Sequence, residues 1–181
     1  MSEELEVLKL VTAGLDKTGI PYIISGSMAA NLYTIPRMTR DIDIVVELKS
    51  IKVNSFITIF EKDFYIDRDA LEEALVRQSI FNVIHKEYVI KIDFIVRKTS
   101  EFQEATFLRR RKVLVEHQPI WFISPEDLIL AKLLWARDSY SEMQFNDVKN
   151  ILRTSIDVDR GYIAGWINQM GLAEVAKKVG L

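Results

Sequence analysis

Apolar residues recur along the first two thirds of the chain with either a helical or a strand-like spacing. The helical spacing predicts helices at about 3–17, 28–33, 51–60 and 69–77. Runs of β-branched and aromatic residues predict strands at about 22–24, 41–46, 81–84 and 89–96. The short connection between the last two runs favours an antiparallel hairpin, and residues 112–122 favour another that turns around Gln118-Pro119.

The pattern changes at residue 124, beyond which it is helical throughout. Ser124-Pro125-Glu126-Asp127 is a strong helix start, because Ser caps the backbone, Pro suits the first turn and the acids face the positive end of the helix dipole. A helix that is apolar nearly all round is expected at 128–136, followed by helices at about 142–153, 160–169 and 173–178. We therefore expect an α+β fold, with an α/β core at 1–122 and a C-terminal helical part at 123–181 packed on it as one compact unit.

The composition of the 181 residues is that of a globular protein, with 49% apolar and 28% charged residues. Lys and Arg number 24 against 26 Asp and Glu, and the net charge of -2 argues against a strongly basic nucleic-acid module. The absence of cysteine excludes disulfides and thiolate metal sites, and the 2 histidines leave little room for His-based zinc or triad chemistry.

No apolar run approaches the roughly 20 residues of a membrane-spanning helix. The acidic start is unlike a signal peptide, so we expect a cytoplasmic protein with no membrane partner.

The most informative chemistry lies in acidic residues inside the strand-like segments. Asp41 and Asp43 are separated by one residue, so on a strand they point to the same face, about 6 to 7 Å apart along the chain. Asp93 stands in the later strand at 89–96 and shares its face with Lys91. If the two strands are neighbours in the sheet, three carboxylates converge on one spot.

Such a cluster of carboxylates needs a counter-charge. Two unit charges near 4 Å repel by about 4 kcal/mol at an effective dielectric of about 20. Hard divalent cations relieve this repulsion, and Mg²⁺ prefers a few carboxylates together with water and substrate phosphates. The alternative is that each Asp is a solvated strand residue or a turn former. Because Asp is disfavoured in strands, the combination favours a site for Mg²⁺, with Mn²⁺ as a substitute.

Gly26 and Ser27 lie between a predicted strand and a predicted helix, upstream of the acidic strand. Glycine lets the backbone approach a phosphate closely, and the start of a helix offers unpaired N–H groups. The Ser27 hydroxyl adds one more donor. A Gly-Ser pair alone is typical of a simple turn, so its interpretation as a phosphate site depends on this position in the chain.

These pieces together resemble a known motif. Ser25-Gly26-Ser27, a gap of thirteen residues, Asp41-Ile42-Asp43 and the later Ile92-Asp93-Phe94 look like the DNA polymerase β-type nucleotidyltransferase superfamily. The segments 36–43 and 124–133 are similar to the AbiEii-like group of minimal bacterial and archaeal nucleotidyltransferases. The resemblance covers about residues 20–152. The gap is at the long end of the family's range, and Ser25 replaces a residue that is usually apolar.

The resemblance implies a minimal, palm-like fold with a mixed β-sheet core flanked by helices. It implies that Gly26 and Ser27 hold the triphosphate of an NTP such as ATP, and that Asp41, Asp43 and Asp93 bind Mg²⁺ and carry catalysis. The implied reaction moves a nucleoside monophosphate to a hydroxyl of an RNA, protein or small-molecule acceptor and releases pyrophosphate. The AbiEii-like group also implies a toxin that acts on an acceptor such as tRNA and is paired with an antitoxin.

Other charged residues have two interpretations each. Lys132 either covers apolar surface with its stem or binds the nucleotide phosphates, and the resemblance supports the second. Asp147 lies where similar proteins carry an acid that orients this lysine, although a structural salt bridge is favoured. Arg37 and Arg40 flank the acidic strand, where they either meet the triphosphate and acceptor or are solvated. The basic run at 109–112 favours a solvated strand or turn, with contact to an RNA acceptor as the alternative, and the tryptophans are expected in the core.

We therefore expect an NTP-dependent nucleotidyltransferase. The alternative is a non-catalytic nucleotide-binding or regulatory protein on the same fold, and a purely structural protein is the third class. The complete set of acids favours catalysis over the other two.

Overall fold

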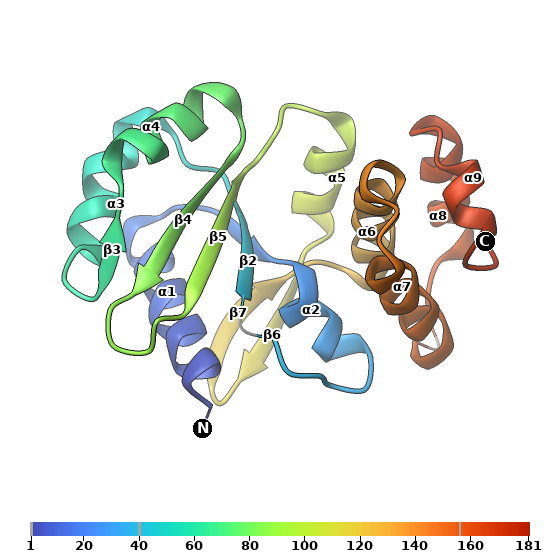
Figure 1. The fold of residues 1–181 in the computed structure, drawn as a ribbon, viewed down its shortest axis with the longest axis horizontal. Coiled ribbons are helices and arrows are strands. Elements are labelled where there is room, and N and C mark those ends of the chain that lie inside the picture. Colours follow the sequence, from blue (N-terminus) through green and yellow to red (C-terminus); the bar gives the residue numbers. More distant parts are fainter. Residues whose placement is uncertain (1, 40, 156) are drawn as a thin grey trace.

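The computed structural model describes residues 2–39, 41–155 and 157–181. Within these residues, a 7-stranded mixed sheet has the order β3-β4-β5-β2-β1-β7-β6 (Figure 1). The strands are β1 (Tyr22–Ile24), β2 (Asp41–Val46), β3 (Phe64–Ile66), β4 (Ile80–His85), β5 (Lys91–Val96), β6 (Arg111–Val115) and β7 (Gln118–Phe122). The helices are α1 (Glu3–Thr18), α2 (Gly26–Tyr33), η1 (Ser50–Lys52), α3 (Val53–Phe60), α4 (Arg68–Arg77), α5 (Glu101–Arg109), α6 (Pro125–Ser139), α7 (Glu142–Thr154), α8 (Arg160–Gln169) and α9 (Ala173–Lys177).

Two parallel pairings determine which strands meet at the centre of the sheet. β2 pairs parallel with β5, and β1 pairs parallel with β7. The pairs β1–β2, β3–β4, β4–β5 and β6–β7 are antiparallel. Because parallel neighbours need a long crossover, the chain leaves β2, forms α3 and α4, and returns through β4 before it reaches β5. The two acidic strands, far apart in sequence, thereby become direct neighbours.

An aromatic core supports one face of β4 and β5. The Phe56 ring of α3 lies 5.2 Å from the Phe94 ring of β5 and 5.7 Å from the Phe81 ring of β4, measured between centroids. Phe60 extends this cluster, 4.8 Å from Phe56. These side chains are buried. Because side chains alternate along a strand, anchoring this set on the inner face directs the intervening residues to the opposite face.

The helices that follow the sheet lie together beside α2 and α5, to the right in Figure 1. α6 is the centre of this group and packs on α2, α7, α8 and α9. Its N-cap is Ser124, whose hydroxyl accepts the N–H of Asp127, and Pro125 occupies the first turn. The expected start of this helix is thus confirmed. None of the helices in the described segments is long and apolar enough to cross a membrane.

The structure confirms the α+β class, the mixed sheet flanked by helices, and the expected helices and strands to within a few residues. The sequence pattern misses β3, which spans only 3 residues, and α5, whose buried residues are few. The second hairpin turns at Glu116-His117, where φ is 44° and 73°, and not around Gln118-Pro119, which belong to β7. Trp135 is 56% exposed, so its expected place in the core is wrong. The division into parts at 122–123 stays a prediction.

Candidate active site

Two neighbouring strands carry the acidic residues onto one face of the sheet. Asp43 of β2 and Asp93 of β5 occupy the same register position of the parallel pair, and Asp41 pairs in the same way with Lys91. Ile42 on β2 points to the opposite face and is fully buried. The alternation that separates buried from accessible positions on both strands therefore places the three carboxylates on a common surface.

The turn between β1 and α2 is built around Asp43. The N–H of Ser25 donates to the Asp43 carbonyl oxygen at 2.9 Å, and the N–H of Ser27 donates to the Asp43 carboxylate. Gly26 has a φ of +58°, and a Cβ added there would lie 1.8 Å from Asp43 Oδ2. Glycine is thus required at 26 both by the left-handed backbone and by the carboxylate packed against it. The start of α2 and the acidic strand form one unit.

Burial raises the pKa of the Asp43 carboxyl, and the nearby carboxylates of Asp93 and Asp41 raise it further. The positive charge of Lys132 and the hydrogen bond from the Ser27 backbone act in the opposite direction without cancelling the rise. The ionised form of Asp43 therefore lies in surroundings that lack enough positive charge. This is the electrostatic condition under which a bound cation is stabilised.

Lys91 supplies part of the missing positive charge. Its Nζ lies 2.9 Å from Asp93 Oδ2 and 3.9 Å from Asp41 Oδ1. The hydrogen bond to Asp93, together with the charges of Asp93, Asp41 and Asp43, raises the pKa of Lys91 despite some desolvation. The other Asp93 oxygen, Oδ1, is buried and has no hydrogen-bond partner among the described residues.

These residues fit a hard divalent cation by their chemistry, although the site is not preassembled. Carboxylate oxygens are the ligands that Mg²⁺ prefers, and the unpartnered Asp93 Oδ1 next to Asp43 is an available donor. Among the described residues, however, no three acidic or imidazole side chains are already arranged around one point. The Asp41 side chain is 59% exposed, and the Lys91 ammonium lies between it and Asp93. Binding a metal thus requires these two side chains to move.

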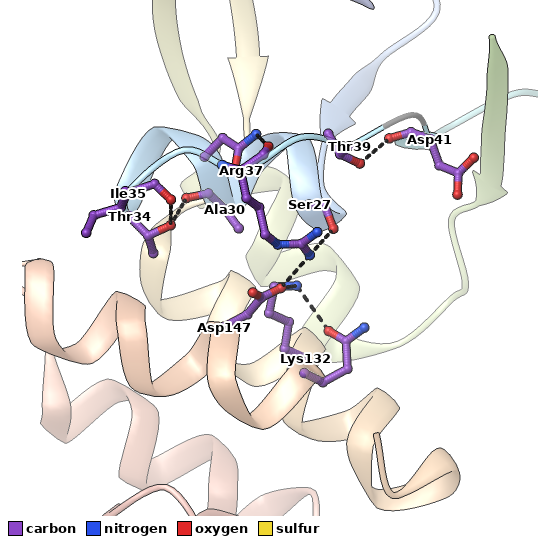
Figure 2. Close-up of polar contacts among 11 residues, drawn as sticks. Ser27, Ala30, Thr34, Ile35, Arg37, Thr39, Asp41, Lys132 and Asp147 are labelled. Carbon is purple, nitrogen blue, oxygen red and sulfur yellow. Dashed lines mark hydrogen bonds and ion pairs between the residues drawn. The ribbon is translucent and has the colours of Figure 1, made fainter. Parts of the chain in front are cut away.

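A second polar network joins the start of α2 to the C-terminal helices (Figure 2). Arg37 Nη2 donates to Ser27 Oγ at 2.7 Å and to Asp147 Oδ2 at 3.2 Å. Lys132 Nζ donates to the same Asp147 oxygen at 2.8 Å and to Gln144 Oε1 at 3.0 Å. Lys132 is buried, with 4% of its side chain exposed. The salt bridge expected for Lys132 and Asp147 is therefore present.

This network lies close enough to the acids for the positive charge of Lys132 to act on Asp43, where it limits the rise in the pKa of the carboxyl. Burial alone would raise the pKa of Asp147, but hydrogen bonds and charges from Lys132 and Arg37 outweigh it and lower that pKa. Asp147 thus stays ionised and contacts both cations, one of which, Arg37, also contacts Ser27. Arg40, the other arginine expected here, lies outside the described residues.

The basic run at 109–112 is occupied by contacts within the protein. Arg109 Nη2 and Arg111 Nη2 lie 3.2 and 3.5 Å from Glu126 Oε2, a carboxylate that is 2% exposed. Arg110 and Lys112 lie over the Trp121 ring, each 4.6 Å from its centroid. These four side chains hold α5 and β6 against their neighbours, so the run is not a free basic patch.

Alternation along the strand predicts that Lys91 shares a face with Asp93, but it assigns Lys91 no role. The signal was present, because a lysine two residues from a strand acid shares that acid's face. The link from Arg37 through Asp147 to Lys132 spans 110 residues of sequence and has no local signal. The reason for glycine at 26 was also missed, because the atom it makes room for belongs to Asp43.

No family model matches the sequence, and no curated protein matches it. Several solved structures share its fold. An antigenic nucleotidyltransferase-like protein from Paracoccidioides brasiliensis has a TM-score of 0.59 at 18% identity, over 98% of this chain and 94% of that one. The lincosamide antibiotic adenylyltransferase LnuA, bound to lincomycin, has a TM-score of 0.55 at 18% identity, over 87% of this chain and 99% of its own.

The protein ANT(2'')-Ia, in complex with adenylyl-2''-tobramycin, has a TM-score of 0.55 at 13% identity, over 98% of this chain and 95% of that one. The sheet and its helices therefore have the fold of nucleotidyltransferases, as the resemblance implied. The AbiEii-like group stays a prediction.

Proposed function

We propose that this chain, which has the fold of nucleotidyltransferases, is itself a Mg²⁺-dependent nucleotidyltransferase. The observation that carries the proposal is the register pairing of Asp43 with Asp93, with Gly26 packed against the Asp43 carboxylate. Together these place a carboxylate pair beside a helix start that offers N–H groups to phosphate. A purely structural sheet has no need of this arrangement.

The triphosphate would be held at the start of α2. Gly26 would supply a backbone N–H and Ser27 its hydroxyl, which Arg37 already contacts, whereas the Ser27 N–H is used by Asp43. Lys132, fixed by Asp147, adds a positive charge close to Asp43. Arg40 belongs to this proposal from the sequence alone. Cations placed in advance around transferring phosphoryl groups stabilise the charge that develops there.

Asp41, Asp43 and Asp93 would hold Mg²⁺ or Mn²⁺. When bound, the metal would neutralise charge on the phosphates and polarise the reacting oxygens. The acceptor hydroxyl oxygen would bond to the α-phosphorus while the bond to the pyrophosphate oxygen breaks. The hydroxyl proton would pass to the Asp93 carboxylate. The products would be the nucleotidylated acceptor and pyrophosphate.

The acceptor and the biological role are the finer part of the proposal. An RNA such as tRNA, a protein or a small molecule would present the hydroxyl. The solved structures bound to lincomycin and to adenylyl-2''-tobramycin support a small molecule as the acceptor. The similarity to the AbiEii-like group supports a toxin neutralised by an antitoxin. Growth arrest on expression of wild type, and its loss in Asp43→Ala, would support this role. Normal growth under conditions where transfer is measured would contradict it.

The main test is transfer of label from each of the four α-³²P-labelled NTPs, with Mg²⁺ or Mn²⁺. Total RNA, protein extract, lincomycin and tobramycin serve as separate acceptors. Wild type should label at least one acceptor and release pyrophosphate, and Asp43→Ala should lose at least about 100-fold of this rate. Asp138→Asn, at a carboxylate that is 68% exposed, is the matched control and should keep wild-type activity. Equal labelling by Asp43→Ala would overturn the assignment.

A non-catalytic nucleotide-binding protein is the second candidate, because the acid cluster is not preassembled around one point. It predicts that an NTP with Mg²⁺ raises the melting temperature while no pyrophosphate forms. Binding to the folded state alone would stabilise it by about 2.7 kcal/mol at a ligand concentration of 100 times Kd. Stabilisation without turnover on any acceptor would favour this candidate.

A further inference from the structure

Lys91 stands inside the acid cluster and has a different character from Lys132. Its ammonium contacts Asp93 Oδ2 at 2.9 Å and Asp41 Oδ1 at 3.9 Å. Among the residues that the structure describes, no other cation forms an ion pair with Asp41, Asp43 or Asp93. We propose that Lys91 is a built-in counter-ion, which occupies the cluster when no metal is bound and which a divalent cation must displace.

Lys91 and a metal ion would compete for the same carboxylates. Taking Asp41, Asp43 and Asp93 as the metal ligands, as the proposed function does, Lys91 contacts two of the three ligands. Asp93 Oδ2 faces the Lys91 ammonium and cannot bind a metal at the same point. A metal bound at the unpartnered Asp93 Oδ1 would lie beside this ammonium, and the two like charges would repel. The Lys91 ammonium must therefore leave when the metal enters.

The two lysines near the cluster differ in their freedom to move. Lys91 is 41% exposed and lies on the accessible face of β5, opposite Asp41 on one side and Ile84 on the other. Lys132 is 4% exposed and is fixed by Asp147 and Gln144. A lysine on a flexible stem suits a displaceable counter-ion, since its point charge can swing into water without breaking the packing of the strand. Lys132 suits a fixed phosphate ligand.

Two consequences follow for the protein without nucleotide. Lys91 stabilises the metal-free fold, because it offsets the repulsion between carboxylates. It also weakens metal binding, because each binding event must break its contacts. Removing the charge at 91 should therefore have opposite effects on metal-free stability and on metal affinity. If Lys91 formed only a structural salt bridge, removing its charge would lower the metal-free stability without raising the metal affinity.

The test titrates MnCl₂ into nucleotide-free wild type, Lys91→Met and Lys91→Gln by isothermal titration calorimetry, with melting curves in EDTA and in Mn²⁺. Both variants should melt lower than wild type in EDTA and bind Mn²⁺ about tenfold more tightly, the order expected when a like charge is removed from beside the ion. Lys49→Met, at a side chain that is 74% exposed, is the control and should match wild type in both measurements.

The outcomes separate this inference from the proposed function. If both variants bind Mn²⁺ no more tightly than wild type, Lys91 is not a competitor and the inference is overturned, even where wild type transfers nucleotides. Tighter binding by the variants supports the inference, even where wild type transfers no label to any acceptor. Two substitutions of different polarity are used so that one poorly folded variant does not decide the result.

Discussion

Asp43 and Asp93 lie directly opposite each other on two parallel neighbouring strands. Parallel pairing in register leaves them on the same face, so their carboxylates repel unless a cation lies between or beside them. Lys91 contacts Asp93 and Asp41, whereas Asp43 receives a backbone N–H from Ser27 and the more distant charge of Lys132. Asp43 is thus the member of the cluster with the least direct compensation, and its contribution to the metal-free fold is unfavourable.

This leads to the prediction that Asp43→Asn stabilises the protein in EDTA. The amide keeps an oxygen that can accept the Ser27 N–H, but it removes the negative charge beside Asp93. We expect the free energy of unfolding to rise by about 1 kcal/mol, a Coulomb term reduced for partial exposure. Denaturant unfolding in EDTA measures this change. When the measurement is repeated in saturating Mg²⁺, the metal should stabilise wild type but not the variant.

Asp138→Asn, at a solvated carboxylate, is the control for loss of a charge and should leave both measurements near wild type. A destabilised Asp43→Asn in EDTA would contradict the view that this carboxylate is held against repulsion. If Mg²⁺ still raises the free energy of unfolding of Asp43→Asn, the metal binds elsewhere.

Gly26→Ala should damage both stability and activity, and two other glycines separate the causes. Gly19 also has a left-handed φ, +62°, but nothing lies within 4 Å of an added Cβ, so Gly19→Ala measures backbone strain alone, about 1 kcal/mol. Gly26→Ala adds a clash with the Asp43 carboxylate and should cost about 1–3 kcal/mol more. Gly165, inside α8 with open space, should tolerate Ala or gain about 0.5–1 kcal/mol.

Denaturant unfolding of the three glycine variants gives the stabilities, and label transfer gives the activities. Only Gly26→Ala should lose nucleotide transfer, because its methyl group displaces the Asp43 side chain. Equal stability losses for Gly19→Ala and Gly26→Ala would mean that the chain relaxes around the clash and that Asp43 is not held by close packing.

The buried ion pair of Lys132 and Asp147 should show strong coupling in a double-mutant cycle. Their side chains are 4% and 9% exposed, and the Nζ–Oδ2 distance is 2.8 Å. Removing one partner leaves a buried charge, so Lys132→Met and Asp147→Leu should each cost about 3 kcal/mol. The double variant should cost less than the sum by about 1–2 kcal/mol. Urea unfolding measures the cycle.

The cost of Lys132→Met should be the smaller of the two, because Asp147 keeps its contact to Arg37, which is 39% exposed. Strict additivity would contradict direct coupling of the pair. The exposed pair of Arg77 and Glu73 on α4 is the matched control, and its cycle should give a coupling below about 1 kcal/mol.

Local periodicity explains which parts of the site could be predicted from the sequence. Alternation along β2 and β5 is a property of a few consecutive residues, so the shared face of Asp41 and Asp43 and that of Lys91 and Asp93 could be predicted. The pairing of β2 with β5 could not, because it depends on the crossover through α3, α4 and β4. The motif resemblance, and not periodicity, implied that these acids meet.

The buried charges show a different limit. Glu126 and Asp127 are common helix-start residues, and their sequence context predicts a role toward the helix dipole. In the structure they are almost fully buried and accept contacts from α5, β6 and α8. These partners come from separate segments of the chain, so the local sequence at a helix start cannot predict them. The basic run at 109–112 favours a solvated segment in the sequence for the same reason, because its partners also lie in separate segments.

Tyr162→Phe tests this buried network and should destabilise the protein in a pH-dependent manner. Asp127 is fully buried, and its carboxylate accepts the Tyr162 hydroxyl at 2.7 Å and the Ser124 hydroxyl at 2.7 Å. Burial raises the pKa of Asp127, while the hydrogen bonds from Tyr162 and Ser124 hold that rise in check. Losing the Tyr162 donor raises this pKa further. Phe keeps the ring that lies 3.9 Å from the Arg109 guanidinium, so the change isolates the hydroxyl.

Because the donor favours the ionised carboxylate, its loss costs most at a pH where Asp127 is ionised. Because the pKa of Asp127 is raised in the folded state, the free energy of unfolding falls as the pH rises from about 4 through that raised value. The fall should be larger in the variant than in wild type, because its Asp127 pKa is raised further. Tyr162→Phe should thus lose about 1–3 kcal/mol at pH 8 and markedly less near pH 4. Urea unfolding at both pH values measures it, with Tyr140→Phe, at a side chain that is 70% exposed, as the control. A loss of the same size at both pH values would mean that the hydroxyl acts through packing and not through the charge of Asp127.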